Sequence, residues 1–374
     1  MRHAAQVLKG MVLLVCLGNS ALLRAEERLI EVAPGERVLW SERQMRDFAL
    51  ERRKSGFCGG FFDVTDFQAD VLPAVRASEI FDGRTPAQSD KVHALSKELS
   101  AGQWFQTVER LSTFHNRFYK SDTGVAAMHW VRDRFAEIGA SRRDFSVELV
   151  SHAGFPQPSV IARLQGRGPY AAQRIVLGAH GDSINWSGFV SQARAPGADD
   201  DASGVASLLE IFRVMVVSGY QPDRTIEFMV YAAEERGLLG SQAIAREYNL
   251  AAAPVTAVLQ LDMTGYPGQK RTIHLISDYV SRGLTQFLAM LIDTYIQLPW
   301  AEESCGYACS DHASWNKVGF PSAFPFEASN DEYNRHIHTE SDTADRLDAA
   351  FSMAMVKLGL AFALELATEN SCLN

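Results

Sequence analysis

The chain contains 374 residues, 47% of which are hydrophobic, and its mean hydropathy of −0.10 is close to zero. This composition is typical of a soluble globular protein, and the length suits one large domain with a smaller appendage. The formal net charge is −9 at pH 7, and no long basic run supplies the clustered cations that phosphate contacts need, so nucleic acid is not an expected partner.

The first residues predict a secretory signal peptide. Arg2 and Lys9 precede an apolar run at 11–17, and small residues follow up to Ala25. This run is shorter than the roughly 20 residues that a membrane-spanning helix needs. We expect cleavage after Ala25, a secreted or periplasmic product without a membrane anchor, and no later stretch that spans a membrane.

Residues 26–88 are predicted to form a small separate unit. Helical patterning at 41–48 is followed by a glycine- and phenylalanine-rich segment at 57–62. The segment at 78–90 has the small and polar composition of a linker. We therefore expect the signal peptide at 1–25, an N-terminal region at 26–88 and the main domain at 89–374.

The main domain alternates helix and strand patterns. Residues 130–138 and 202–217 place apolar side chains at helical spacing, and apolar runs at 174–178, 225–231 and 255–261 predict buried strands. Strands that alternate with helices indicate an α/β fold in three layers, with a largely parallel sheet between helices. Sites in such sheets gather at the carboxyl ends of the strands.

Candidate metal ligands follow these strands. The first strand leads into His180 and Asp182, the second into Glu234 and Glu235, and the third into Asp262. Acidic and imidazole groups that converge on one sheet edge would repel or desolvate one another unless cations neutralised them. Nitrogen and carboxylate ligands without thiolates suit zinc better than cobalt or manganese.

A pair of metal ions also needs a bridging carboxylate. The turn before the helix at 202–217 offers three consecutive candidates, Asp199, Asp200 and Asp201. The alternative interpretation is a solvated helix N-cap, which fits Asp199 or Asp201.

After signal cleavage four cysteines remain: Cys58, Cys305, Cys309 and Cys372. In an oxidising compartment they can form disulfides, and the close pair Cys305 and Cys309 could close a small loop. A metal site is the poorer interpretation of that pair because two partner ligands are missing nearby. The pairing of Cys58 with Cys372 stays open.

Six ordered motifs carry a family resemblance: GAHGDS, APGADDDASG, FMVYAAEERGLLGS, LQLDMTGY, CGYACSDHASW and IHTESDT. Over about residues 90–370 the chain resembles the two-zinc aminopeptidases of the M28 metallopeptidase family, and most closely the bacterial secreted leucine aminopeptidases. The resemblance implies a three-layer zinc-peptidase fold with a mixed, mostly parallel sheet. It also implies two zinc ions per chain and peptide or protein N-termini as substrates.

The resemblance assigns the site residues one by one. It implies that His180 and Asp262 ligate one zinc, that Glu235 and His338 ligate the other, and that Asp200 bridges both. Glu234 becomes the general base and Asp182 orients His180. A cis peptide is implied between Asp200 and Asp201.

Two further histidines are weighed against this ligand set. The match of the IHT motif selects His338, because His336 is chemically equivalent and only two residues away. His312 is expected to support the site by packing or hydrogen bonding.

The resemblance also implies a pocket for the first substrate side chain, beside a disulfide between Cys305 and Cys309. Such apolar walls favour leucine, methionine or phenylalanine. Asn330 departs from the aromatic residue of the closest relatives, and with Glu302 and Glu303 it could admit a basic side chain, so Lys or Arg preference stays open. The implied pocket residues are Met263, Ile276, Tyr307, Phe324, Phe326, Tyr333 and Ile337.

Other interpretations are a single-zinc enzyme like the glutaminyl cyclases, which share the scaffold, and a non-catalytic receptor domain. The complete set of ligands and base argues against both. Residues 26–88 are interpreted as a propeptide that covers the site and is removed by a processing protease, and a permanent accessory domain is the alternative. We expect a monomer.

Overall fold

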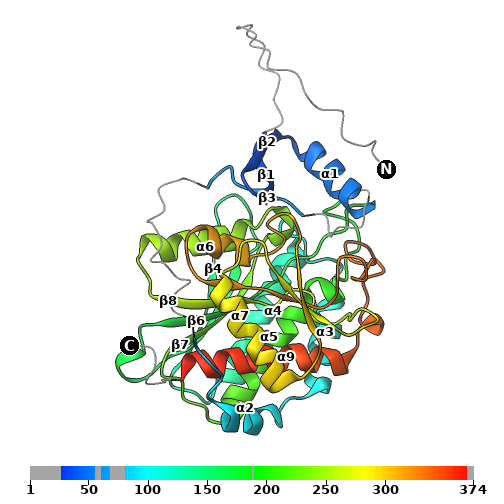
Figure 1. Ribbon diagram of the computed structural model, residues 1–374. Coiled ribbons are helices and arrows are strands. Elements are labelled where there is room, and N and C mark those ends of the chain that lie inside the picture. The colour runs from blue at the N-terminus through cyan, green and yellow to red at the C-terminus, as the bar shows by residue number, and fades with distance from the viewer. Residues whose placement is uncertain (1–26, 55–59, 68–80, 82, 188, 369–374) are drawn as a thin grey trace, which may run out of the picture.

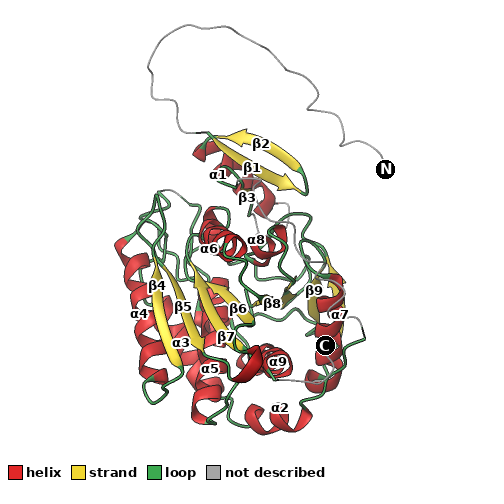
Figure 2. Cartoon of the chain, turned by 90° about the vertical axis from the view of Figure 1, so that its left-hand side faces the viewer, coloured by secondary structure: helices red, strands yellow, loops and turns green. Residues whose placement is uncertain are grey.

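The computed structural model describes residues 27–54, 60–67, 81, 83–187 and 189–368. The predictions that concern the signal peptide, Cys58 and Cys372 lie outside these residues. The main body is a six-stranded sheet between helices, with the strand order β11-β8-β6-β7-β5-β4 (Figure 2). Its strands are β4 (Phe145–Val150), β5 (Ser159–Leu164), β6 (Arg174–His180), β7 (Thr225–Tyr231), β8 (Val255–Gln260) and β11 (Ser322–Ala323).

Parallel pairing dominates the middle of this sheet. The pairs β11–β8, β8–β6 and β6–β7 are parallel, whereas β7–β5 and β5–β4 are antiparallel. The expected α/β fold with a mixed, mostly parallel sheet is therefore confirmed.

Each face of the sheet is covered by its own group of helices. Successive strand residues point to opposite faces, so Leu177 and Phe228 enter the larger core, whereas Val176 and Met229 enter the smaller one. The larger core contains α3 (Ala101–Ser112), α4 (Asp122–Gly139), α5 (Gly204–Val217) and α9 (Ala349–Ala367). The smaller core contains α6 (Leu239–Leu250) and α8 (His312–Lys317).

Helix α9 corrects the expectation that no later segment has membrane-spanning character. It is long and apolar enough to cross a membrane by length and composition alone. However, 72% of its apolar window is buried, and it packs against α5 and β6 in the larger core. Because it is apolar on nearly every side, it is typical of a fully buried core helix.

A second sheet flanks the main one, with the strand order β10-β9-β12. Its strands are β9 (Ile273–Ile276), β10 (Trp300–Glu303) and β12 (Pro325–Phe326), and helix α7 (Arg282–Leu291) follows β9. Ile276 and Phe326 from this sheet belong to one apolar cluster beside the candidate site. Helix α2 (Ser89–Ser96) packs against α5 and α9.

The N-terminal unit, defined here by the described residues of 27–67, lies on one end of the main body (Figure 1). It contains β1 (Arg28–Ala33), β2 (Glu36–Trp40), α1 (Glu42–Lys54) and β3 (Phe62–Asp63), in a sheet of order β2-β1-β3. Its Ile30 and Phe61 share an apolar cluster with Tyr119 and Trp186 of the main body. The helix predicted at 41–48 is confirmed as α1.

Candidate active site

Three neighbouring parallel strands bring the candidate ligands together. His180 is the last residue of β6, Glu234 and Glu235 lie in a short helical turn after β7, and Asp262 follows β8. Because β6 pairs with both β7 and β8, the carboxyl ends of all three strands meet at one edge. The sequence-based placement of these residues is confirmed.

The turn that precedes α5 supplies the remaining carboxylates. Residues Ala198–Ser203 form this turn, and the peptide between Asp200 and Asp201 is cis, as the resemblance implies. The carboxylate of Asp201 accepts hydrogen bonds from the backbone N–H groups of His180 at 3.0 Å, Gly204 at 2.8 Å and Met263 at 3.2 Å. The carboxylate of Asp201 therefore links the first residue of α5 to the two segments that carry the candidate ligands His180 and Asp262.

This burial corrects the alternative of a solvated N-cap. Asp199 and Asp201 are both fully buried. Burial raises the pKa of Asp199 to about 8, and Asp342 adds to the shift. From the sequence alone, three consecutive aspartates predict an exposed polar turn. Their burial could not be predicted, because it depends on packing against segments that are distant along the chain.

Five side chains form two groups of closely spaced donor atoms, and Asp200 belongs to both. The first group contains His180, Asp200 and Asp262, and the second contains Asp200, Glu235 and His338. One Asp200 oxygen lies 2.9 Å from His180 Nε2, and the other lies 2.9 Å from His338 Nε2. His338 Nε2 is also 2.9 Å from Glu235 Oε2.

The charge balance of this cluster fits bound cations. Burial alone would lower the pKa of His338, but Glu235 and Asp200 raise it to about 10. Burial raises the pKa of Glu235 to about 7, and its buried Oε1 has no hydrogen-bond partner among the described residues. A buried carboxylate oxygen without a donor, beside further carboxylates and imidazoles, suits a metal ligand.

Glu234 and Asp182 stand next to this cluster. Glu234 is partly exposed and lines the pocket that contains the five ligand candidates. Burial raises its pKa well above the usual value, and Asp311 adds to the shift although His180 opposes it. Asp182 lies 3.4 Å from His180 Nδ1 through Oδ1, the position from which a carboxylate orients a ligating imidazole.

An apolar pocket adjoins the ligands. Four of the seven expected pocket residues line it, namely Met263, Tyr307, Phe324 and Phe326. The other three do not line it but share one apolar cluster with Met263, Phe324 and Phe326, against which Cys305 and Cys309 pack. Cys305 and Cys309 form a disulfide. Asn330 and Gly60 of the N-terminal unit also line this pocket. The clustered residues are Met263, Ile276, Phe324, Phe326, Tyr333 and Ile337.

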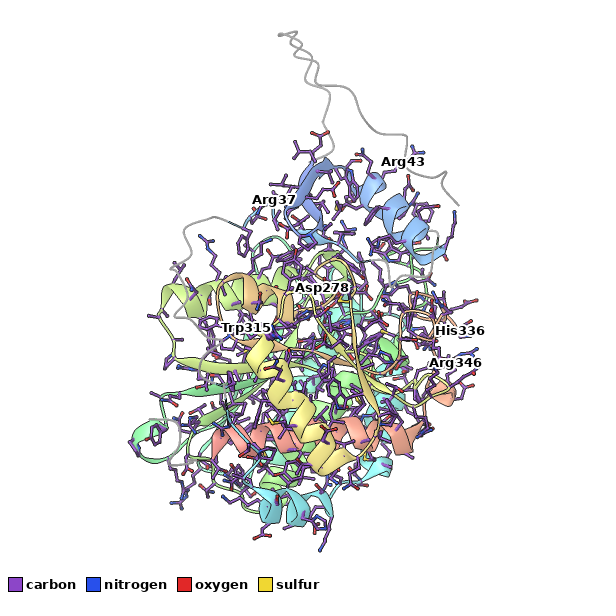
Figure 3. All side chains as sticks on the ribbon, viewed as in Figure 1. Arg37, Arg43, Asp278, Trp315, His336 and Arg346 are labelled. Atoms are coloured by element: carbon purple, nitrogen blue, oxygen red, sulfur yellow. A yellow bond between two sulfur atoms is a disulfide. The ribbon has the colours of Figure 1, made fainter. Side chains whose placement is uncertain are left out.

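The other histidines take no part in the two donor groups of the described residues. His312 Nε2 lies 3.1 Å from the backbone oxygen of Asp278, and its ring packs on Phe324 at 4.9 Å. Figure 3 places Asp278 on the side of the body that faces the N-terminal unit. The supporting position expected for His312 is therefore observed.

Sequence reasoning missed residues that form hydrogen bonds to the candidate ligands and to their turn. Ser310 Oγ donates to Asp262 Oδ2 at 2.6 Å. The carboxylate of Asp342 accepts hydrogen bonds from the backbone N–H groups of Asp199 at 3.1 Å and Asp200 at 3.2 Å. Ser310 and Asp342 both lie within the motifs CGYACSDHASW and IHTESDT, but no spacing distinguishes such supporting side chains from ordinary polar residues.

Known proteins with the same fold were compared with this chain. The model of Peptidase family M28 matches residues 159–363. A probable leucine aminopeptidase of Arthroderma otae is 40% identical over 316 residues, which are 83% of this chain and 86% of that protein. The crystal structure of the LapA aminopeptidase of Legionella pneumophila is 34% identical, with a TM-score of 0.80, and covers 90% of this chain and 92% of that chain.

These similarities identify the family. The chain belongs to peptidase family M28, whose members are metal-dependent peptidases. Within the family it is a metallo-aminopeptidase, a hydrolase. The two alignments cover 83% and 90% of this chain, which is more than residues 89–374 alone make up. The similarity therefore extends into the N-terminal region.

A glutaminyl cyclase of Porphyromonas gingivalis has a TM-score of 0.60 to this chain at 21% identity. That likeness shows the shared fold alone.

Proposed function

We propose that the chain is a secreted two-zinc aminopeptidase that hydrolyses the N-terminal residue of peptides and prefers leucine or other large apolar residues. The observation that carries the proposal is the shared position of Asp200, whose two oxygens face different histidines at 2.9 Å. A carboxylate that faces two separate ligand groups is the arrangement expected of a bridge between two metal ions.

Each zinc has its own set of ligands in this proposal. His180 and Asp262 would hold one ion, Glu235 and His338 would hold the other, and Asp200 would contribute a carboxylate oxygen to each. When bound, the two ions supply Lewis acidity that polarises the scissile carbonyl and acidifies the attacking water. Ser310 supports this set by donating to Asp262.

Glu234 moves the protons of the reaction. Its carboxylate takes a proton from the attacking water and later delivers it to the leaving amine, as a general base and then a general acid. Asp182 orients His180. Its carboxylate also accepts hydrogen bonds from the backbone N–H groups of Glu234 and Glu235, and so positions the turn that carries the proposed base.

The residues that line the pocket support exopeptidase specificity. Its apolar wall receives the first side chain, and the carboxylates beside it offer an anionic partner for the free α-amino group. A peptide without that cationic group cannot make this contact, so it is expected to bind more weakly than a peptide with a free N-terminus. This requirement restricts cleavage to N-terminal residues.

The N-terminal unit is proposed to cover the site as a propeptide. Gly60 lines the pocket, and its backbone N–H donates to the Tyr307 hydroxyl at 3.3 Å. The guanidinium of Arg52 lies 4.3 Å from the Tyr307 ring centroid and donates to the backbone oxygen of Cys305 at 3.4 Å. A segment that contacts the rim of the pocket in this way obstructs a peptide substrate.

We propose that a processing cut falls before Phe81. Phe81 is buried, and the backbone N–H groups of Ala87 and Gln88 donate to the buried Glu365 carboxylate at 2.9 Å and 2.8 Å. A cut N-terminal to Phe81 would leave these contacts in the mature enzyme. Limited proteolysis with N-terminal sequencing should therefore place the cut before Phe81 and raise activity, whereas an uncut chain with full activity would support a permanent accessory domain.

The proposed activity is tested with leucine-p-nitroanilide and its N-acetylated form as the matched control. We expect hydrolysis of the free-amine substrate alone, loss of activity after chelation, and recovery on addition of zinc. Equal hydrolysis of the acetylated substrate, or activity that resists chelation, would contradict the proposal. Cyclisation of an N-terminal glutamine without hydrolysis would instead support a glutaminyl-cyclase-like enzyme.

A further inference from the structure

Arg117 is a buried cation that no motif singled out. It lies in the loop between α3 and α4, and only 1% of it is exposed. Its guanidinium donates to the backbone oxygens of Gly181 at 2.9 Å, Pro196 at 2.5 Å and Gly197 at 2.9 Å. The planar fork of an arginine can reach several acceptors at once with little loss of side-chain entropy per bond.

These acceptors belong to two different turns of the candidate metal centre. Gly181 lies between His180 and Asp182, whereas Pro196 and Gly197 lead directly into the turn that carries Asp200. One guanidinium thus joins the turn after β6 to the turn before α5. The two turns are otherwise separated along the chain by the segment 182–195.

A second link runs beside the first. The backbone N–H of Arg117 donates to Ser183 Oγ at 3.0 Å, and Ser183 Oγ donates to the backbone oxygen of Ala195 at 2.8 Å. Gly197 has a φ of 55°, and an added Cβ there would lie 2.8 Å from Arg117 Nη2 and 2.5 Å from the backbone oxygen of Asp200. The Asp200 turn is therefore packed directly against the guanidinium, with no room for a side chain between them.

The charge of Arg117 also acts on this site. Burial tends to lower its pKa, and the carboxylates of Asp342, Asp201, Asp200 and Asp182 oppose that shift. The guanidinium thus places a fixed positive charge behind the carboxylates of the metal centre. Such a charge offsets part of their mutual repulsion when the metal is absent.

We propose that Arg117 is a positioning residue of the metal centre, which fixes the turn of His180 and Asp182 relative to the turn of Asp200. The inference rests on the proposed two-zinc function. Residues that orient metal ligands from behind change metal affinity or activity by about 10- to 100-fold when they are replaced. A purely structural arginine would change the stability of the fold and leave zinc affinity unaltered.

Arg224 provides a matched control. It is also 1% exposed, and its guanidinium donates to the backbone oxygens of Leu366 at 3.1 Å and Thr368 at 3.3 Å. It precedes β7, at the end of the strand opposite Glu234. The substitutions Arg117→Lys and Arg224→Lys therefore each remove a buried guanidinium that donates to backbone oxygens. Arg117 lies beside the candidate site, whereas Arg224 is remote from it.

The experiment measures zinc dissociation constants by chelator competition and the Tm of the metal-free protein. We expect Arg117→Lys to bind zinc about 10- to 100-fold more weakly than the unmodified chain, whereas Arg224→Lys lowers Tm without weakening zinc binding. Unchanged zinc affinity in Arg117→Lys, or equal weakening in Arg224→Lys, would overturn the inference.

A second variant covers the case in which Arg117→Lys does not fold. Ser183→Ala removes the parallel link and leaves the guanidinium in place, and weaker zinc binding is expected of it too. Unchanged zinc affinity in a folded Ser183→Ala protein would then overturn the inference. Failure of the proposed function is distinguishable, because the unmodified chain itself would then bind fewer than two zinc ions.

Discussion

The carboxylate of Asp182 accepts a hydrogen bond from the backbone N–H of Glu234 at 3.0 Å. Its other oxygen accepts from the backbone N–H of Glu235 at 3.2 Å, and the side chain also faces His180. One aspartate after β6 thus fixes the proposed base and a proposed ligand after β7. The position of the proposed base therefore depends on the turn that follows the proposed ligand His180.

The shared carboxylate gives the first prediction. Asp200→Asn should lose zinc together with activity, because an amide cannot supply two anionic oxygens to two ions. Asp199→Asn should be milder: with a pKa of about 8 the Asp199 carboxyl is mostly neutral at pH 7, and asparagine resembles that neutral form. Zinc content after dialysis measures both variants, and equal loss would mean that the bridge is a different carboxylate.

Zinc content after dialysis also shows which of the two neighbouring histidines, His336 or His338, binds metal. His338→Ala should lose zinc, because His338 Nε2 faces both Asp200 and Glu235 at 2.9 Å. His336→Ala is the matched control and should keep its zinc. Loss in the control alone would assign the ligand to His336.

The disulfide gives the second prediction. Mass spectrometry of the non-reduced protein should find Cys305 and Cys309 joined, and reduction should raise KM modestly while kcat changes less. The expected change is modest because Asp278 Oδ2 still accepts from the backbone N–H groups of Cys305 at 2.7 Å and Gly306 at 3.1 Å. Free thiols at both positions would refute the pairing.

Acid should loosen the N-terminal unit. Burial tends to raise the pKa of Glu31, but hydrogen bonds from Lys317 at 2.6 Å and Tyr279 at 2.7 Å outweigh it and lower the pKa below 4.5. The ionised Glu31 carboxylate therefore stabilises the folded contact above pH 4.5. This contribution to stability is lost as the pH falls through the lowered folded-state pKa. Amide protection in β1 should therefore fall in acid.

Two variants check this third prediction by hydrogen exchange. Glu31→Gln should reduce the protection of β1 at neutral pH and remove most of its acid dependence. Asp66→Asn alters the ion pair of an 82% exposed carboxylate and should change little, because exposed pairs contribute little. Acid-independent protection of β1 in the unmodified chain would contradict the account.

Substrate preference is the fourth prediction. Leucine-p-nitroanilide should be cleaved faster than its lysine analogue, because an apolar pocket disfavours a desolvated ammonium. The Glu303 carboxylate accepts from Asn330 Nδ2 at 3.0 Å, so Glu303→Gln should leave this preference intact. Faster cleavage of the lysine substrate, abolished by Glu303→Gln, would establish the basic preference instead.

The three central strands β6, β7 and β8 could be predicted from the sequence, because apolar runs mark buried strands locally. The other strands of the structure were not predicted. Thr225–Tyr231 is a strand over the same residues that the pattern indicates. The positions of His180, Glu235 and Asp262 follow from those strand ends. His338 lies in a loop without such periodicity, so only the resemblance distinguished it from His336.

Supporting residues could not be predicted in this way. Arg117 binds backbone oxygens of distant turns, and backbone acceptors leave no mark in the sequence. The burial of Asp199 and Asp201 likewise depends on packing between remote segments. The membrane-spanning character of helix α9 was missed in the sequence. Its length and composition alone do not distinguish a buried core helix from a membrane span.

The most direct test of the two-zinc mechanism is a zinc titration of the metal-free chain and of Glu234→Gln, followed by measurement of kcat on leucine-p-nitroanilide. Glutamine keeps the shape of the side chain but cannot accept the proton. The account predicts two zinc ions per chain in both proteins and a fall in kcat of about 10² to 10⁴ in the variant. Fewer than two zinc ions in the unmodified chain, or most of the activity retained in Glu234→Gln, would contradict it.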